Sequence, residues 1–212
     1  MEEKLEKKFD FTVVSEAFLT LRNLSAKVEV KLGRKKTISV VLTGEKCSDK
    51  VSVSLSDEGH VIIQEPASID DNSVNRVIRN RKRFSIIVFV PLGTNIFIYD
   101  VHDAHIYGVR GSIVADIKKQ AYLSAIEAVN VSLKCSERSH CNMTNIEGNL
   151  TLAVSNHSIV GIQGNYHKVE ITASESSAVT IAGNCHSLEV AADSSSSINL
   201  GCKVKAKSKE KK

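Results

Sequence analysis

Two consecutive stretches of the chain align residue by residue without a gap: NLTLAVSNHSIVGIQGNYH (149–167) and KVEITASESSAVTIAGNCH (168–186). Each has 19 residues, with apolar side chains at its second, fourth, twelfth and fourteenth positions, and the pattern extends to blocks 130–148 and 187–205. A fixed period of this length is typical of solenoids, in which each repeat forms one coil. The sixteen apolar positions are Val131, Leu133, Cys141, Met143, Leu150, Leu152, Val160, Ile162, Val169, Ile171, Val179, Ile181, Leu188, Val190, Ile198 and Leu200.

Each block predicts two short strands with alternating side chains. The third position is polar in all four blocks, so positions two and four point into the core and position three points to solvent. Two polar turns should separate the strands: a Ser-rich turn such as SNHS (155–158), and a turn containing GNYH (164–167) or GNCH (183–186). We expect hydroxyl ladders to explain the repeated serines. Stacked coils lie about 4.8 Å apart.

Working outward, the pattern predicts an all-β, single-domain β-solenoid, a right-handed parallel β-helix, with an N-terminal run of short strands. Looser coils extend upstream through Ile113 and Ala115 to Ile96 and Ile98, spaced 17 and then 18 residues. The short strands are expected at 9–14, 18–21, 27–32, 37–43, 51–55, 61–64 and 84–90. The expected organisation is a flexible N-terminus (1–8), a solenoid domain (9–202, made of N-terminal strands 9–65, an exposed basic loop 66–83 and stacked coils 84–202) and a Lys-rich disordered tail (203–212).

Charge is concentrated in two segments. The 212 residues are 42% hydrophobic and 25% charged and carry a net charge of +4. The loop 76–83 and the tail 203–212 carry +5 each, which leaves the rest of the chain at −6. The tail is interpreted as a charged guard against end-to-end stacking. The loop could bind anionic partners weakly and without sequence preference, through Arg76, Arg79, Arg81, Lys82 and Arg83.

Cysteine usage and the first residues bear on the compartment. Five cysteines, at 47, 135, 141, 185 and 202, follow no regular spacing and include no CxxC motif, which argues against a disulfide framework. The first eight residues contain no hydrophobic signal segment. The sequence therefore predicts a cytoplasmic protein, or a surface or periplasmic one where a signal peptide has been removed. No apolar run approaches the length of a membrane span.

Two residue pairs are candidate sites. His167 and His186 occupy equivalent positions and should stack about 5 Å apart, next to the parallel pair Asn165 and Asn184. We interpret them as a turn-stabilising ladder whose side chains point outward, with Tyr166 in place of a second thiol beside Cys185, and expect no metal. Glu170 and Glu189 are also equivalent, at a spacing that matches the paired carboxylates of retaining glycosidases. We interpret them as part of a solvated polar face and expect no catalytic residue and no cofactor.

The layout resembles the head-GIN-domain family, whose members are described as candidate auto-transporter adhesins. The matching features are an opening strand (11–14), the segment FSIIVFVP (84–91) and the Ser-rich coils through Leu200, so the resemblance covers about residues 9–202. It implies a β-helical, adhesin-like module, and the family has no established catalytic residues.

These observations favour a non-enzymatic β-solenoid binding or structural protein that presents a flat, polar, repetitive face to a cell-surface glycan or protein. One alternative is a polysaccharide-active enzyme on a β-helix, which acidic residues converging in one groove would favour. The other is a scaffold that binds anionic partners through the basic loop. Homo-oligomerisation is left open.

Overall fold

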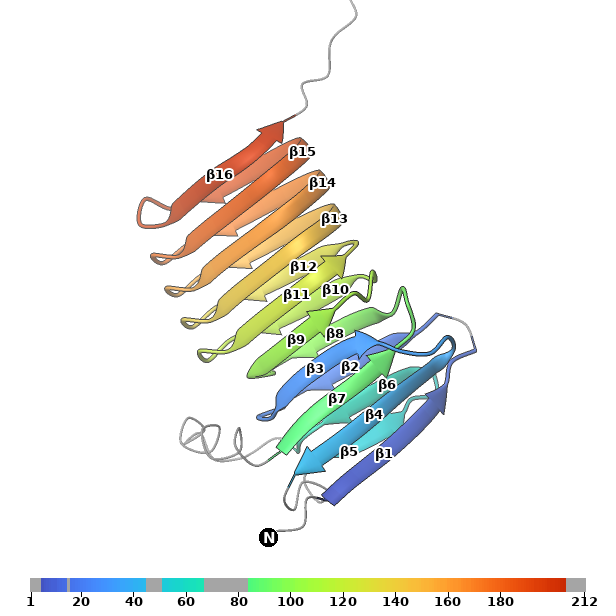
Figure 1. Ribbon diagram of the computed structural model, residues 1–212. Helices are drawn as coiled ribbons and strands as arrows, with labels where there is room; N and C mark the ends of the chain where they lie inside the picture. Colours follow the sequence, from blue (N-terminus) through green and yellow to red (C-terminus); the bar gives the residue numbers. More distant parts are fainter. Residues whose placement is uncertain (1–4, 15, 45–50, 67–83, 205–212) are drawn as a thin grey trace, which may run out of the picture.

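The computed structural model describes residues 5–14, 16–44, 51–66 and 84–204, and every regular element in these ranges is a β-strand (Figure 1). The fold is an all-β, single-domain β-solenoid, as the repeat predicts. The strands are β1 (Leu5–Thr12), β2 (Phe18–Arg22), β3 (Lys27–Leu32), β4 (Thr37–Gly44), β5 (Ser52–Leu55), β6 (His60–Gln64), β7 (Phe84–Val90), β8 (Asn95–Tyr99), β9 (Asp103–Tyr107), β10 (Ile113–Ile117), β11 (Tyr122–Ala128), β12 (Val131–Cys135), β13 (His140–Val154), β14 (Ile159–Ala173), β15 (Ala178–Ala192) and β16 (Ser197–Val204).

Each coil contributes one strand to each of two sheets. Sheet I contains β5, β6, β2, β8, β10, β12 and the C-terminal halves of β13, β14 and β15; sheet II contains β1, β4, β7, β3, β9, β11, the N-terminal halves of the same three strands and β16. The pairing between successive coils is parallel and in register with the repeat. Ile113 lies between Ile96 and Val131, which confirms the 17- and 18-residue spacing of the upstream coils.

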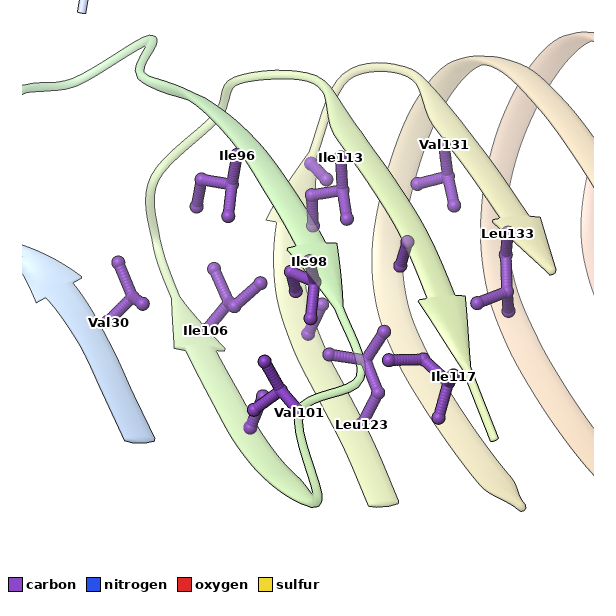
Figure 2. Packing of buried hydrophobic residues seen from close by; sticks show 14 of the residues in the cluster. Val30, Ile96, Ile98, Val101, Ile106, Ile113, Ile117, Leu123, Val131 and Leu133 are labelled. Carbon is purple, nitrogen blue, oxygen red and sulfur yellow. The ribbon is translucent and has the colours of Figure 1, made fainter. Parts of the chain in front are cut away.

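The core lies between the two sheets. Equivalent side chains of successive coils form rows there, and Figure 2 shows one row of buried side chains with Ile96, Ile113 and Val131. Twelve of the sixteen apolar repeat positions are at most 3% exposed, because each is covered by the equivalent residue of the next coil. The last coil is different: Val190 is 44% exposed and Leu200 is 39% exposed. Among the described residues, β16 pairs with β15 alone, so no further coil covers these side chains.

The Ser-rich turns are built as a hydrogen-bonded ladder. In the turns at 136–139, 155–158 and 174–177 the two central residues have positive φ, for example Asn156 at 54° and His157 at 58°. The serines that close these three turns, Ser139, Ser158 and Ser177, are buried. The hydroxyl of a closing serine accepts a backbone N–H from the coil before: Ser139 N–H donates to Ser158 Oγ at 3.2 Å, and Ser177 N–H donates to Ser196 Oγ at 3.3 Å. The expected hydroxyl ladder is therefore confirmed.

The prediction of a turn at GNYH (164–167) and GNCH (183–186) is wrong. The backbone remains in strand through GNYH and GNCH, so β14 and β15 each pass from sheet II to sheet I without interruption. Gly164 explains this, because a Cβ there would lie 2.0 Å from the carbonyl oxygen of Ile146; without one, adjacent coils stay paired around the corner. Tyr166 does not point outward as expected. It is 2% exposed and its hydroxyl donates to the carbonyl of Ala182 at 3.3 Å.

The N-terminal strands form the first layers of the same two sheets. β2 pairs in parallel with β8, and β3 pairs in parallel with β9. Beyond them the direction reverses: β4 is antiparallel to β7 and β1, and β5 is antiparallel to β6. This end of the stack therefore finishes in antiparallel strands rather than in another coil.

Two expected boundaries are corrected by the strand pairing. Residues 5–8 belong to β1 instead of a flexible terminus, because their backbone pairs with β4 as far as Gly44. Residues 203 and 204 belong to β16 instead of the tail, because they continue its pairing with Asn184 and Cys185 of β15. The rest of the expected tail (205–212) and the basic loop from residue 67 to 83 lie outside the described residues. Within the described ranges, no helical segment has the length and apolar character needed to cross a bilayer.

Candidate functional site

A polar groove runs along the corner where each coil passes from sheet II to sheet I. Five successive coils line it, which at about 4.8 Å per coil gives a length of about 19 Å. Its volume is about 370 Å³. The polar side chains that line it are Arg110, Glu127, Asn145, Glu147, Gln163, Asn165 and Asn184.

Glycines leave part of this groove without side chains. Gly164 and Gly183 both line it. A Cβ on Gly183 would lie 1.8 Å from the carbonyl oxygen of Gly164, so the corner accepts no larger residue without a shift of the backbone. Gly183 is partly exposed and Gly164 is buried, and the neighbouring amide side chains form the walls of the groove.

The two ends of the groove differ in charge. At one end Arg110 Nη2 lies 3.7 Å from Glu147 Oε1, and both side chains are more than half exposed. At the other end Asn184 Nδ2 donates to Asn165 Oδ1 at 2.8 Å. A side-chain amide offers two donors and an acceptor with two lone pairs, so this bond leaves further hydrogen-bonding capacity on both side chains.

The predicted histidine pair lies beside the groove. The rings of His167 and His186 have their centroids 5.5 Å apart, near the expected spacing, but their planes are tilted by 42°. His186 Nδ1 lies 3.2 Å from the carbonyl oxygen of Tyr166, so that ring is tied to the backbone of the coil below. In the described part of the chain, no three His, Cys, Asp or Glu side chains come together as a metal site. The arrangement fits the expected Asn/His ladder.

The predicted glutamate pair lies on the outer face of sheet I. Glu170 and Glu189 are paired in register, and Lys168 Nζ contacts both carboxylates, that of Glu189 at 3.6 Å. The hydrogen bond from Lys168 holds the pKa of Glu170 below its ordinary value. A retaining glycosidase needs one carboxyl kept neutral as the acid, and this lysine favours the ionised form of Glu170.

Arg76, Arg79, Arg81, Lys82 and Arg83 lie outside the described residues. Of the other predicted site residues, the two histidines lie next to each other and the two glutamates lie next to each other. The two pairs are at different places on the surface. Neither pair lines the groove, although Asn165 and Asn184 do.

Aromatic clusters on both outer faces were missed by the sequence reasoning. On sheet II, Tyr122 lies 5.5 Å from His105 and 5.7 Å from His140 between ring centroids; on sheet I, Phe18 lies 4.5 Å from His60. Several of these rings stack on one another, so we interpret them as cross-strand pairs that stabilise the sheets. A usable signal was present, since 105, 122 and 140 follow the coil spacing of 17 and 18 residues.

No protein-family model matches the chain, and no curated protein matches its sequence. Solved structures do align with it over most of its length. A candidate lipid-binding protein from Parabacteroides distasonis is 13% identical, with 94% of this chain and 95% of that chain covered and a TM-score of 0.48. A candidate adhesin from Bacteroides fragilis is 12% identical, with 92% and 97% covered and a TM-score of 0.44. A candidate cell adhesion protein from Clostridium sporogenes is 13% identical, with 94% and 100% covered and a TM-score of 0.36. Values this low assign no function to the present chain.

Proposed function

We propose that this chain is a non-enzymatic binding module that holds a glycan in the corner groove. The observation that carries the proposal is that five successive coils supply amide or charged side chains to one continuous groove. Hydroxyl-rich ligands are recognised by such convergent hydrogen-bonding groups. A length of about 19 Å suits an extended oligosaccharide better than a single small metabolite.

The mixed charge of the groove limits which kinds of glycan could bind there. Arg110 and Glu147 neutralise each other in part, Glu127 adds one negative charge, and the amide end carries no charge. A neutral or weakly charged sugar chain therefore fits better than a strongly anionic polymer. A glycan ligand favours the cell surface or periplasm over the cytoplasm, in line with the adhesin-like role that the resemblance to head-GIN domains implies.

Screening the purified full chain against glycans and cell-wall fragments tests this proposal. The double variant Asn165→Ala/Asn184→Ala should weaken binding of any hit at least tenfold, as measured by calorimetry. Asn142→Ala is the matched control, because Asn142 is exposed on the outer face of sheet II and does not line the groove. Binding that survives the double variant would contradict the proposed site.

The enzyme alternative has its own readout in the same samples. Release of reducing or unsaturated sugar ends, lost in Glu170→Gln or Glu189→Gln, would show that the carboxylate pair is catalytic and that the protein is an enzyme. We expect the substrates to remain intact, because Glu170 and Glu189 are both bridged by Lys168 on an exposed face.

A further inference from the structure

Two cysteine thiols meet inside the core. Cys135 is the last residue of β12 and Cys141 is the second residue of β13, and the Ser-rich turn between them reverses the chain. Both side chains are fully buried, and their sulfur atoms lie 3.4 Å apart. A disulfide needs a sulfur–sulfur distance of about 2.05 Å, so a shift of about 1.4 Å joins them.

Neighbouring coils show what these two positions normally hold. Cys135 is paired in register with Ile117 below and Val154 above, and Cys141 with Leu123 below and Val160 above. In those coils the same two positions are buried aliphatic residues, Ile117 with Leu123 and Val154 with Val160. Of these three coils, only the middle one has cysteine at both positions. Because aliphatic residues fill the same positions in its neighbours, packing does not require sulfur there.

The two thiols differ in acidity. Cys141 donates a hydrogen bond to Cys135 Sγ, which lowers the pKa of Cys135. The same contact, together with burial, raises the pKa of Cys141. In the folded coil, Cys135 is therefore the thiol that ionises first.

We propose that Cys135 and Cys141 form an intrachain disulfide by exchange with a low-molecular-weight disulfide such as oxidised glutathione. The Cys135 thiolate attacks one sulfur of that disulfide, which forms a mixed disulfide and releases one thiolate. The Cys141 thiolate then attacks Cys135 Sγ and releases the second thiolate. The protein loses two protons and two electrons, and the reagent is reduced to two thiols.

Burial sets when this exchange takes place. Neither sulfur is accessible in the folded coil, so the reagent reaches Cys135 while the chain folds or while the coil opens locally. The two cysteines are close in sequence, which keeps their effective concentration high even in the unfolded chain. Once formed, the bond is protected from external reductants by the same burial.

Refolding the full chain from denaturant with and without oxidised glutathione tests the proposal. After alkylation, trypsin cleaves at Arg138, between the two cysteines, so their peptides remain joined only through a disulfide. We expect the joined peptide, about 2 Da lighter than the sum of its reduced halves, only in the oxidised sample. The oxidised protein should also have a higher midpoint of thermal unfolding than the reduced protein.

Variants separate this disulfide from other thiol chemistry. Cys135→Val/Cys141→Val copies the aliphatic pair of the next coil, so it should fold and lose the difference between oxidised and reduced samples. Cys202 lies on β16, and Cys202→Ser should keep the difference between oxidised and reduced samples. Recovery of both cysteines as alkylated thiols after oxidative refolding, or linkage of either one to another cysteine, would overturn the proposal.

Discussion

The buried hydroxyl of Ser158 holds the Ser-rich turn of one coil to the next coil. Ser158 is fully buried, and its Oγ accepts the backbone N–H of Ser139, which also donates to the carbonyl of Ser136 at 3.3 Å. Ser158→Ala removes one of two acceptors, so it should lower the free energy of unfolding by about 1 kcal/mol. Urea unfolding measures this. Ser132→Ala, on an exposed position of β12, is the control and should change little; equal losses in both variants would contradict the ladder.

Glu29 carries a pH-dependent contribution to stability. Its carboxylate lies 2.7 Å from Lys27 Nζ and 2.6 Å from Lys31 Nζ, and these contacts lower the pKa of Glu29 to about 2. A depressed pKa stabilises the fold above the ordinary value of 4.5, and this contribution is lost as the pH falls from about 5 to about 2.

Glu29→Gln tests this contribution. At pH 7 the variant should be less stable by about 1 kcal/mol or less, because both lysines are partly exposed and screened. Towards pH 2 the difference from the unsubstituted protein should vanish. Urea unfolding at pH 7, 4 and 2.5 measures this difference. If it stays constant over this range, Glu29 does not make the pH-dependent contribution.

At the scale of the element, alternation predicted which side chains enter the core but not the path of the backbone between sheets. The strands at 27–32 and 84–90 were predicted with their observed bounds, because alternating or continuous apolar residues specify a buried strand locally. GNYH resembles a turn in local sequence. Its true conformation depends on the carbonyl of Ile146 one coil away, which leaves room for Gly164 only.

The same limit applies to the candidate site. The stacking of Asn165 on Asn184 follows from the 19-residue period and was predicted. The groove beside them was not, since it lies where the backbone passes the corner at Gly164 and Gly183, and the local sequence does not specify that path. Its charged end combines Arg110 with Glu147, which are not at matching repeat positions and meet only because the coils are stacked.

Within one strand, neighbouring residues should respond oppositely to a charge. Ile181 and Thr180 are adjacent in β15, but Ile181 is fully buried and Thr180 is exposed. Ile181→Lys places an unpaired charge between the sheets and should unfold the C-terminal coils. Thr180→Lys should leave the far-ultraviolet circular dichroism and the unfolding midpoint nearly unchanged. If both lysines are tolerated, the inward assignment of the repeat positions is wrong.

At the scale of the whole molecule, the two ends of the solenoid are finished differently. The N-terminal end closes with antiparallel strands, β1 on sheet II and β5 on sheet I. At the C-terminal end, β16 is the last strand of the described residues, and Val190 and Leu200 are partly exposed. Because each coil is stabilised by contacts with its neighbours, a coil with one neighbour is held less strongly than a coil with two.

This difference predicts a gradient of stability along the stack. Backbone amides in 187–204 should exchange with deuterium faster than those in β14, because local opening of the last coil exposes little additional apolar surface. Leu152→Ala and Leu200→Ala compare the same change at 2% and 39% exposure. We expect the first to cost about 3 kcal/mol and the second about 1 kcal/mol in urea unfolding. Equal protection of both regions together with equal costs would show that the last coil is held as firmly as the interior ones, and that stacking neighbours do not limit its stability.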